Sequence, residues 1–177
     1  SMFERITEET FDAIFPLLEA SFPVTELRTK EDQRRLLQEE GYRLYGVPQE
    51  GGGYGAVFAT WEIDDFFYIE HFAVREEYRN HGYGGQLLEE LLAWKRRPMV
   101  LEVELPEDEL TCRRIGFYQR HGLVFNSYRY LQPPMRKGQD MLPLRLMTRP
   151  AALDEPTYQR YRSKIHSIVY KYEGEKK

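Results

Sequence analysis

The fold is decided by residues 69–88, which read IEHFAVREEYRNHGYGGQLL. Aromatic and β-branched residues across 66–74 predict a strand, and the polar stretch 75–81 predicts a turn. Three glycines then open a segment whose leucines recur on one face of a helix. This order leaves free backbone N–H groups at a helix N-terminus, where the helix dipole also favours negative charge. The stretch therefore predicts an anion site, most often a phosphate site, at the turn.

Composition limits the classes of protein to which the chain can belong. With 177 residues, of which 41% are hydrophobic and 31% charged, it is expected to form one ordinary globular domain. A net charge of −4 and the lack of a long basic run argue against a nucleic-acid partner. No apolar run approaches the ~20 residues that span a bilayer, so no membrane partner is expected. A single cysteine and the lack of a signal-peptide pattern favour a reducing compartment, and we expect the cytoplasm.

The hydrophobic periodicity predicts a mixed order of helices and strands around one sheet. After two N-terminal helices, strands are expected at 42–47, 54–63, 66–74, 100–103, 124–131 and 142–147, and further helices after residue 82, at 111–121 and at 154–172. Pro143 inside the last strand predicts an edge position, because proline cannot donate to a sheet ladder. We expect residues 1–150 to form the core and residues 151–177 to add an amphipathic helix and tail to the same domain.

Two known nucleotide-binding loops are alternative assignments for the glycine-rich turn. A Rossmann site needs Gly-x-Gly-x-x-Gly directly after a first strand, and a Walker loop needs Gly-Lys-Ser/Thr. The turn lies in mid-chain and contains neither pattern, so both assignments are disfavoured. Gly82-Tyr-Gly84 by itself is a weak signal, because strand-to-helix turns also use glycine for packing.

Two motifs in sequence give a more specific match. Arg79-Asn-His-Gly82-Tyr-Gly84 follows the strand, and Arg114-Ile-Gly-Phe-Tyr118 runs on to Gly122 in a later helix. Together they resemble the GNAT superfamily of acyl-CoA-dependent N-acetyltransferases, over roughly residues 42–130. The resemblance implies an α/β (α+β type) single domain, in which helices flank a central, twisted, mixed and mostly antiparallel sheet and a C-terminal helix is added. It does not define the substrate, because the superfamily acetylates many kinds of amine.

The resemblance also implies acetyl-CoA as cosubstrate and a position for each part of it. The pyrophosphate would accept hydrogen bonds from backbone N–H groups of the turn, and the pantetheine arm would lie along the strand like an added strand. The cofactor-binding residues expected on this basis are Phe72, Val74, Arg79, Asn80, His81, Gly82, Tyr83, Gly84 and Gly85. His81 is expected to contribute its backbone and not its imidazole.

Two side chains are candidates for moving protons. The resemblance assigns Tyr118 as the general acid that protonates the leaving thiolate, although a core tyrosine is the alternative. Glu70 is the candidate base, because strand alternation is expected to place it on the face of Phe72; a structural ion pair is an equally good interpretation. His71 titrates in a more convenient range, but the same alternation points it to the opposite face. No metal site is expected, because the histidines are isolated.

The predicted activity is acetyl transfer to a primary amine of a small molecule or peptide by direct attack, without an acyl-enzyme. The acceptor cleft is expected beside residues 22–26 and the loop through Pro133 and Pro134, with Glu26 and Glu104 available to attract a cationic amine. One alternative is a non-catalytic acyl-CoA-binding or sensing domain. Another is a structural protein whose C-terminal helix mediates dimerisation, and monomer and homodimer both stay open.

Overall fold

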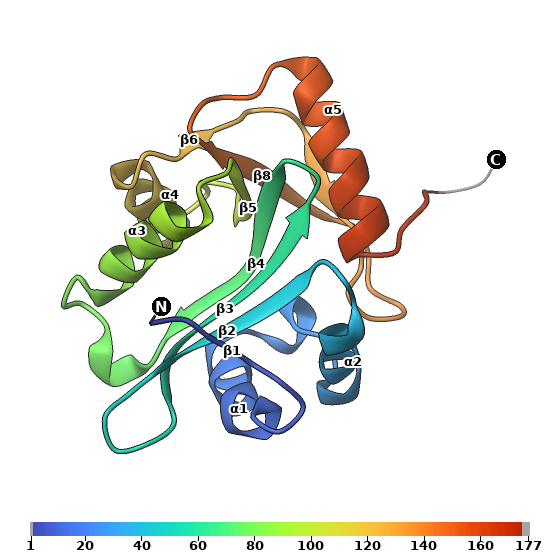
Figure 1. Ribbon diagram of the computed structural model, residues 1–177. Helices are drawn as coiled ribbons and strands as arrows, with labels where there is room; N and C mark the ends of the chain where they lie inside the picture. Colours follow the sequence, from blue (N-terminus) through green and yellow to red (C-terminus); the bar gives the residue numbers. More distant parts are fainter. Residues whose placement is uncertain (1, 175–177) are drawn as a thin grey trace. The chain divides into compact units, whose positions relative to one another are not determined.

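The computed structural model describes residues 2–174 (Figure 1). Within it the chain divides into two compact units, one ending at Arg96 and the other beginning at Arg97. The expectation of a single domain with a core over 1–150 stays a prediction, and the last three residues of its tail lie outside the described residues.

The first unit consists of four strands with helices and short 3-10 turns. Its elements are β1 (Glu4–Arg5), α1 (Phe11–Ser21), η1 (Val24–Glu26), α2 (Lys30–Arg35), η2 (Leu36–Gln38), β2 (Tyr42–Pro48), β3 (Tyr54–Ile63), β4 (Phe66–Val74), η3 (Glu76–Tyr78) and α3 (Tyr83–Lys95). The strands are ordered β1-β2-β3-β4 and every neighbouring pair is antiparallel. β3 is buried along nearly its whole length, because both of its edges are paired and helices cover both faces.

Helices cover both faces of this sheet. In Figure 1, α1 and α2 lie along one side of the strands and α3 along the other. The buried stripe of α1 comes so close to β2 that a Cβ on Gly46 would lie 2.8 Å from Cδ1 of Ile14. On the opposite face, a Cβ on Gly84 at the start of α3 would lie 3.6 Å from both Phe72 and Val74 of β4. Glycine therefore permits a close approach at Gly46, whereas a Cβ at position 84 would make ordinary van der Waals contact.

A β-bulge interrupts β4. Ala59 pairs with His71 and Thr60 pairs with Ile69, so Glu70 has no partner residue on β3. The extra residue reverses the alternation of side chains on one side of it. The expectation that Glu70 shares a face with Phe72 through simple alternation is therefore wrong, and so is the expectation that Glu70 and His71 point to opposite faces.

The second unit is built around its longest strand. Its elements are β5 (Met99–Glu104), α4 (Glu109–Arg120), β6 (Val124–Phe125), β7 (Tyr130–Gln132), β8 (Leu142–Arg149), α5 (Glu155–Lys164) and a π-helical turn η4 (Ile165–Val169). β8 pairs with β5 along one edge and with β6 and β7 along the other, all antiparallel. β8 as a whole is therefore not an edge strand, but within the described residues Pro143 itself pairs on one side only, with Leu131 of β7. Pro143 lies just beyond the last pair with β5, Glu104 with Leu144, so that ladder loses no donor.

The predicted C-terminal helix is present as α5 continued by η4. The carboxylate of Asp154 accepts a hydrogen bond of 2.9 Å from the backbone N–H of Thr157 and caps the helix. Tyr158, Tyr161 and Ile165 bury its apolar face, as the spacing predicts. Helical structure ends at Val169, three residues before the predicted end.

The structure confirms the predicted α/β class, with mostly antiparallel strands flanked by helices and a helix at the C-terminal end. Within residues 2–174, no helix is both long and apolar enough to cross a membrane.

Candidate functional site

The glycine-rich turn has the predicted strand–turn–helix geometry. After β4 and η3, Asn80 and Gly82 adopt positive φ values of 65° and 74°, and α3 begins at Tyr83. Gly82 occupies the N-cap without a side chain to cap the helix, and the first backbone bond of the helix runs from Gln86 N–H to Gly82 at 3.1 Å. The N–H groups of the three residues between them have no acceptor within the helix. The turn therefore presents a row of donors with no competing cap.

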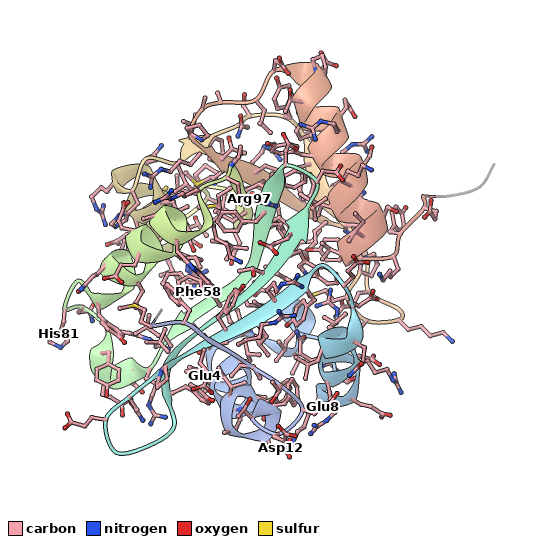
Figure 2. The ribbon with its side chains drawn as sticks, viewed as in Figure 1. Glu4, Glu8, Asp12, Phe58, His81 and Arg97 are labelled. Atoms are coloured by element: carbon pink, nitrogen blue, oxygen red, sulfur yellow. The ribbon has the colours of Figure 1, made fainter. Side chains whose placement is uncertain are left out.

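The charges around the turn also favour an anion. The first turn of α3 contains no acidic residue, and residues 79–85 contribute Arg79 but no carboxylate. Arg79 is exposed and its Nε donates a hydrogen bond of 3.0 Å to the carbonyl of Val74, which fixes the side chain beside the end of β4. His81 is exposed and its imidazole points away from the ribbon (Figure 2), consistent with a backbone role only. A diphosphate fits such a turn, because donors and helix dipole act on it together.

The structure brings the predicted strand residues next to the turn. Phe72 and Val74 are half-buried, and the side chains of both lie 3.6 Å from the position that a Cβ on Gly84 would take. Phe72 stacks on Phe58 of β3, with ring centroids 4.2 Å apart and planes 4° apart. That stacking holds the C-terminal end of β4 against β3, where Phe58 is labelled in Figure 2. Strand and turn residues predicted to bind one cofactor are thus neighbours, and any side chain at position 84 would fill the space between them.

Tyr118 lies in the second unit, in the last third of α4. This helix is held at its start by a capping box between Asp108 and Thr111 and ends at Arg120, two residues before Gly122, whose φ is 80°. Tyr118 is half-buried, and burial raises the pKa of its phenol to about 12 although Arg114 opposes the shift. The phenol is therefore protonated at neutral pH and available as a proton donor. Its assignment as the acid stays a prediction.

Glu70 is held in an ion pair inside the first unit. Its Oε2 accepts a hydrogen bond of 2.6 Å from Arg28, and its Oε1 accepts one of 2.8 Å from the indole N–H of Trp61. The side chains of Glu70 and Arg28 are only 1% and 9% exposed. Burial alone would raise the pKa of Glu70, but Arg28, His71 and the two hydrogen bonds outweigh it and the pKa is lowered. This arrangement is the structural ion pair considered above, while a role as base stays a prediction.

No local pattern predicts the partners of the two carboxylates Glu70 and Glu102. Arg28 lies 42 residues before Glu70 in the chain, and only the bulge in β4 directs Glu70 towards it. In the second unit, Glu102 is a similar case, because its carboxylate accepts hydrogen bonds from three side chains distant in sequence, Tyr130, Gln132 and Tyr170. Glu104, expected to attract an amine, forms an ion pair of 3.0 Å with Arg114.

Comparison with known proteins agrees with this geometry. A family model described as an acetyltransferase (GNAT) domain matches residues 37–123, which include both the turn and Tyr118. A structure from Bacteroides thetaiotaomicron assigned to the GNAT family of acetyltransferases is 39% identical, with a TM-score of 0.87 over 95% of this chain and 97% of that one.

The chain belongs to the GNAT family. The resemblance drawn from Arg79–Gly84 and Arg114–Gly122 is confirmed, and this GNAT chain is accordingly an enzyme of the acetyltransferase class. A search of curated protein sequences found no match.

Two more distant structures share the fold of this GNAT enzyme. The ribosomal-protein-S18-alanine N-acetyltransferase of Escherichia coli is 20% identical, with a TM-score of 0.63 over 86% of this chain and 94% of that one. NAA60 of Arabidopsis thaliana, determined in complex with acetyl-CoA, is 16% identical, with a TM-score of 0.61 over 82% and 96% of the two chains.

Proposed function

We propose that this GNAT enzyme transfers an acetyl group from acetyl-CoA to a primary amine of a small molecule or a peptide. The observation that carries the proposal is the row of uncapped backbone donors at the start of α3, set directly beside Phe72 and Val74. Acetyl-CoA has a diphosphate for the first feature and an extended amide-bearing arm for the second. The complex of the Arabidopsis relative with acetyl-CoA supports the choice of cosubstrate.

In this proposal the turn binds the pyrophosphate and the strand binds the pantetheine arm. The N–H groups from Asn80 to Gly85 donate to phosphate oxygens, and Arg79 adds positive charge at the start of the turn. The main chain at Phe72 and Val74 pairs with the amides of the arm, as an edge strand pairs with an added strand. The chain thereby holds the thioester in a fixed position before the amine arrives.

The chemistry requires the chain to handle two protons. Bound acetyl-CoA supplies an activated acetyl group, which a neutral amine attacks directly. Tyr118 gives its phenolic proton to the departing sulfur, a role that suits a group with a raised pKa because the proton is present at neutral pH. The proton that the acceptor ammonium must lose before attack requires a separate base.

For the acceptor we propose the side of the first unit that carries residues 22–26. Pro23, Val24 and Thr25 are exposed and follow directly on α1, where a short loop can contact a bound amine. The names of structures that share the fold indicate different acceptors, an alanine of ribosomal protein S18 for the Escherichia coli enzyme and spermidine for a chimeric N-acetyltransferase of Vibrio cholerae. A panel of small amines, polyamines and peptide N-termini is therefore the appropriate first screen.

The test is release of free CoA thiol by the wild type with this panel, followed by Tyr118→Phe. Loss of the phenolic proton should lower kcat by about 10²–10⁴-fold and leave the Kd for acetyl-CoA within about twofold. Tyr128→Phe is the matched control, because it removes a tyrosine hydroxyl of the same unit that donates a hydrogen bond of 2.8 Å to the backbone carbonyl of Leu153. It should change kcat by less than about threefold, since it loses one hydrogen bond to a backbone carbonyl and no group assigned to the reaction.

Three results would contradict the assignments. Wild type that binds acetyl-CoA but releases no thiol with any amine would favour the non-catalytic acyl-CoA-binding alternative. Equal loss of acetyl-CoA binding and kcat in Tyr118→Phe would make Tyr118 a structural residue. A loss in Tyr128→Phe as large as that in Tyr118→Phe would show that any buried tyrosine hydroxyl gives the effect.

A further inference from the structure

The bulge in β4 turns two consecutive titratable side chains towards the same segment. Glu70 binds Arg28, while Nε2 of His71 lies 2.8 Å from the backbone carbonyl oxygen of Glu26. The ring of His71 also meets Phe22 edge-on, with centroids 4.6 Å apart. All three partners belong to the stretch 22–28 that follows α1. Both carboxylate oxygens of Glu70 accept hydrogen bonds, whereas only one ring nitrogen of His71 has a hydrogen-bond partner among the described residues.

The hydrogen bond to Glu26 fixes the tautomer of His71. A carbonyl oxygen only accepts, so Nε2 carries the hydrogen and, in the neutral ring, Nδ1 keeps a lone pair. Among the described residues Nδ1 has no hydrogen-bond partner, although His71 is only 3% exposed. The hydroxyl of Ser21, the neighbour of Phe22 in the chain, is likewise buried without a partner. Orphaned polar atoms of this kind require a water or a ligand group to complete them.

The electrostatics keep this lone pair available at neutral pH. Burial lowers the pKa of His71 from its ordinary value of 6.5, and Arg28 acts in the same direction. Glu70 and the Glu26 carbonyl oppose that shift and stabilise the protonated ring once it forms. The carboxylate of Glu70 is a weaker proton acceptor, because its pKa is lowered and both of its oxygens accept hydrogen bonds.

The position of His71 connects it to both substrates of the proposed reaction. Its backbone directly precedes that of Phe72, whose main chain the proposed function assigns to the pantetheine arm, while the two side chains point to opposite faces of β4. Residues 23–25, which follow its contact residue Phe22, are exposed, so His71 lies directly beneath a surface segment on the proposed acceptor side. The chemistry requires a base within hydrogen-bond reach of the acceptor nitrogen, directly or through one water.

We propose that Nδ1 of His71, and not Glu70, accepts the proton from the acceptor ammonium, directly or through one water. The inference rests on the proposed function and names its missing base. An N–H bond of the ammonium breaks, its electron pair stays on nitrogen, and a new N–H bond forms at Nδ1. The nitrogen then attacks the acetyl carbon, the C–S bond breaks, and sulfur leaves with the electron pair and takes the Tyr118 proton. The new amide nitrogen returns a proton to Tyr118, and His71 releases its own to solvent.

The experiment compares wild type, His71→Gln and His166→Gln in thiol-release assays from pH 5 to pH 10. His166 is the matched control, a second buried histidine whose Nε2 also lacks a hydrogen-bond partner within residues 2–174, but which belongs to η4. We expect His71→Gln to lower kcat/KM about 10²–10⁴-fold at pH 7 and to keep the Kd for acetyl-CoA within about twofold. The wild type should lose activity as pH falls below 6.5 and His71 protonates. In His71→Gln, the rate should instead rise about tenfold per pH unit up to the pKa of the amine, because solvent must deprotonate it.

The outcomes separate this inference from the function on which it rests. Thiol release by wild type without an acid limb below pH 6.5 overturns the inference alone, even where His71→Gln fails to fold. A variant with the wild-type pH profile and only a changed KM or Tm also overturns it and makes His71 a latch for residues 22–28. An equal loss in His166→Gln does the same, because any buried histidine would then suffice. No thiol release by wild type with any amine overturns the proposed function, and this inference with it.

Discussion

Two regions of β4 differ in how their polar groups are satisfied: the bulge at Glu70 and the turn that follows Val74. At the C-terminal end the chain leaves backbone N–H groups uncapped and adds glycines, so the turn is open to an anion. At the bulge, four residues before the strand ends, the chain buries a carboxylate and satisfies it with Arg28 and Trp61. The turn is built from residues adjacent in sequence. The bulge depends instead on Arg28, which follows α1, and on Trp61 of β3. One strand thus ends at a turn with open backbone donors and contains, four residues earlier, a polar cluster built from side chains.

The bulge and the turn should respond differently to substitution. A buried ion pair is costly to break, because removal of one partner leaves the other as an unpaired buried charge. An exposed turn tolerates changes of charge but not of backbone conformation, because its geometry depends on positive φ values. Changes at the bulge should therefore act on stability, and changes at the turn on binding.

The largest expected effect on stability is that of Glu70→Ala. It should lower the free energy of unfolding by about 3–5 kcal/mol, because Arg28 stays buried without its counter-charge. Urea denaturation followed by circular dichroism measures the change. Glu31→Ala is the control, since Glu31 pairs with Arg35 on an exposed helix face and should cost less than about 1 kcal/mol. Equal losses of unfolding free energy in the two variants would mean that the Glu70–Arg28 pair contributes no more than an exposed ion pair.

A smaller loss of stability, with a specific loss of binding, is expected for Gly82→Val. A side chain at a φ of 74° should cost about 1–2 kcal/mol. Gly51→Val is the matched control, because Gly51 has a φ of 89° in the β2–β3 hairpin and, like Gly82, has no other atom within 4 Å of the Cβ position. Both variants should lose similar Tm, but only Gly82→Val should lose the rise in Tm that acetyl-CoA gives. Retention of that rise would contradict a phosphate site at the turn.

The smallest effect is a dependence of stability on pH that belongs to the bulge. Glu70 has a pKa below the ordinary 4.5, so its contribution is fully present above that value and is lost as pH falls through its folded pKa. The difference in unfolding free energy between wild type and Glu70→Gln should therefore narrow as pH decreases from 5 to 3. Denaturation at four pH values measures it. A constant difference over this range would show that the charge of Glu70 contributes nothing.

Much of the turn could be predicted because its determinants are local. Strand, polar turn, glycines and helical leucines follow one another within residues 66–92, and each element forms for reasons contained in its own segment. Phe72 and Val74 met Gly84 because a strand and the helix that follows it pack together across such a turn. The predicted C-terminal helix succeeded for the same reason, since its cap and its apolar stripe are both local.

The predictions that failed depended on pairing across the sheet. Pro143 suggested an edge strand, but the position of an edge depends on how far the partner strand extends. Simple alternation placed Glu70 with Phe72, but one unpaired residue in the register with β3 reversed it. Neither fact is written in the neighbouring residues, because a register is a relation between two segments.

By itself the sequence determined the α/β class, the strand–turn–helix geometry at Asn80–Gly85 and the resemblance to the GNAT family, because backbone conformation and helical periodicity follow from residues near in the chain. The tertiary structure alone decided that Glu70 is closed in an ion pair and that Nδ1 of His71 is left without a partner. The bulge in β4 and the segment 22–28 create both conditions, and they act through contacts across more than 40 residues of chain.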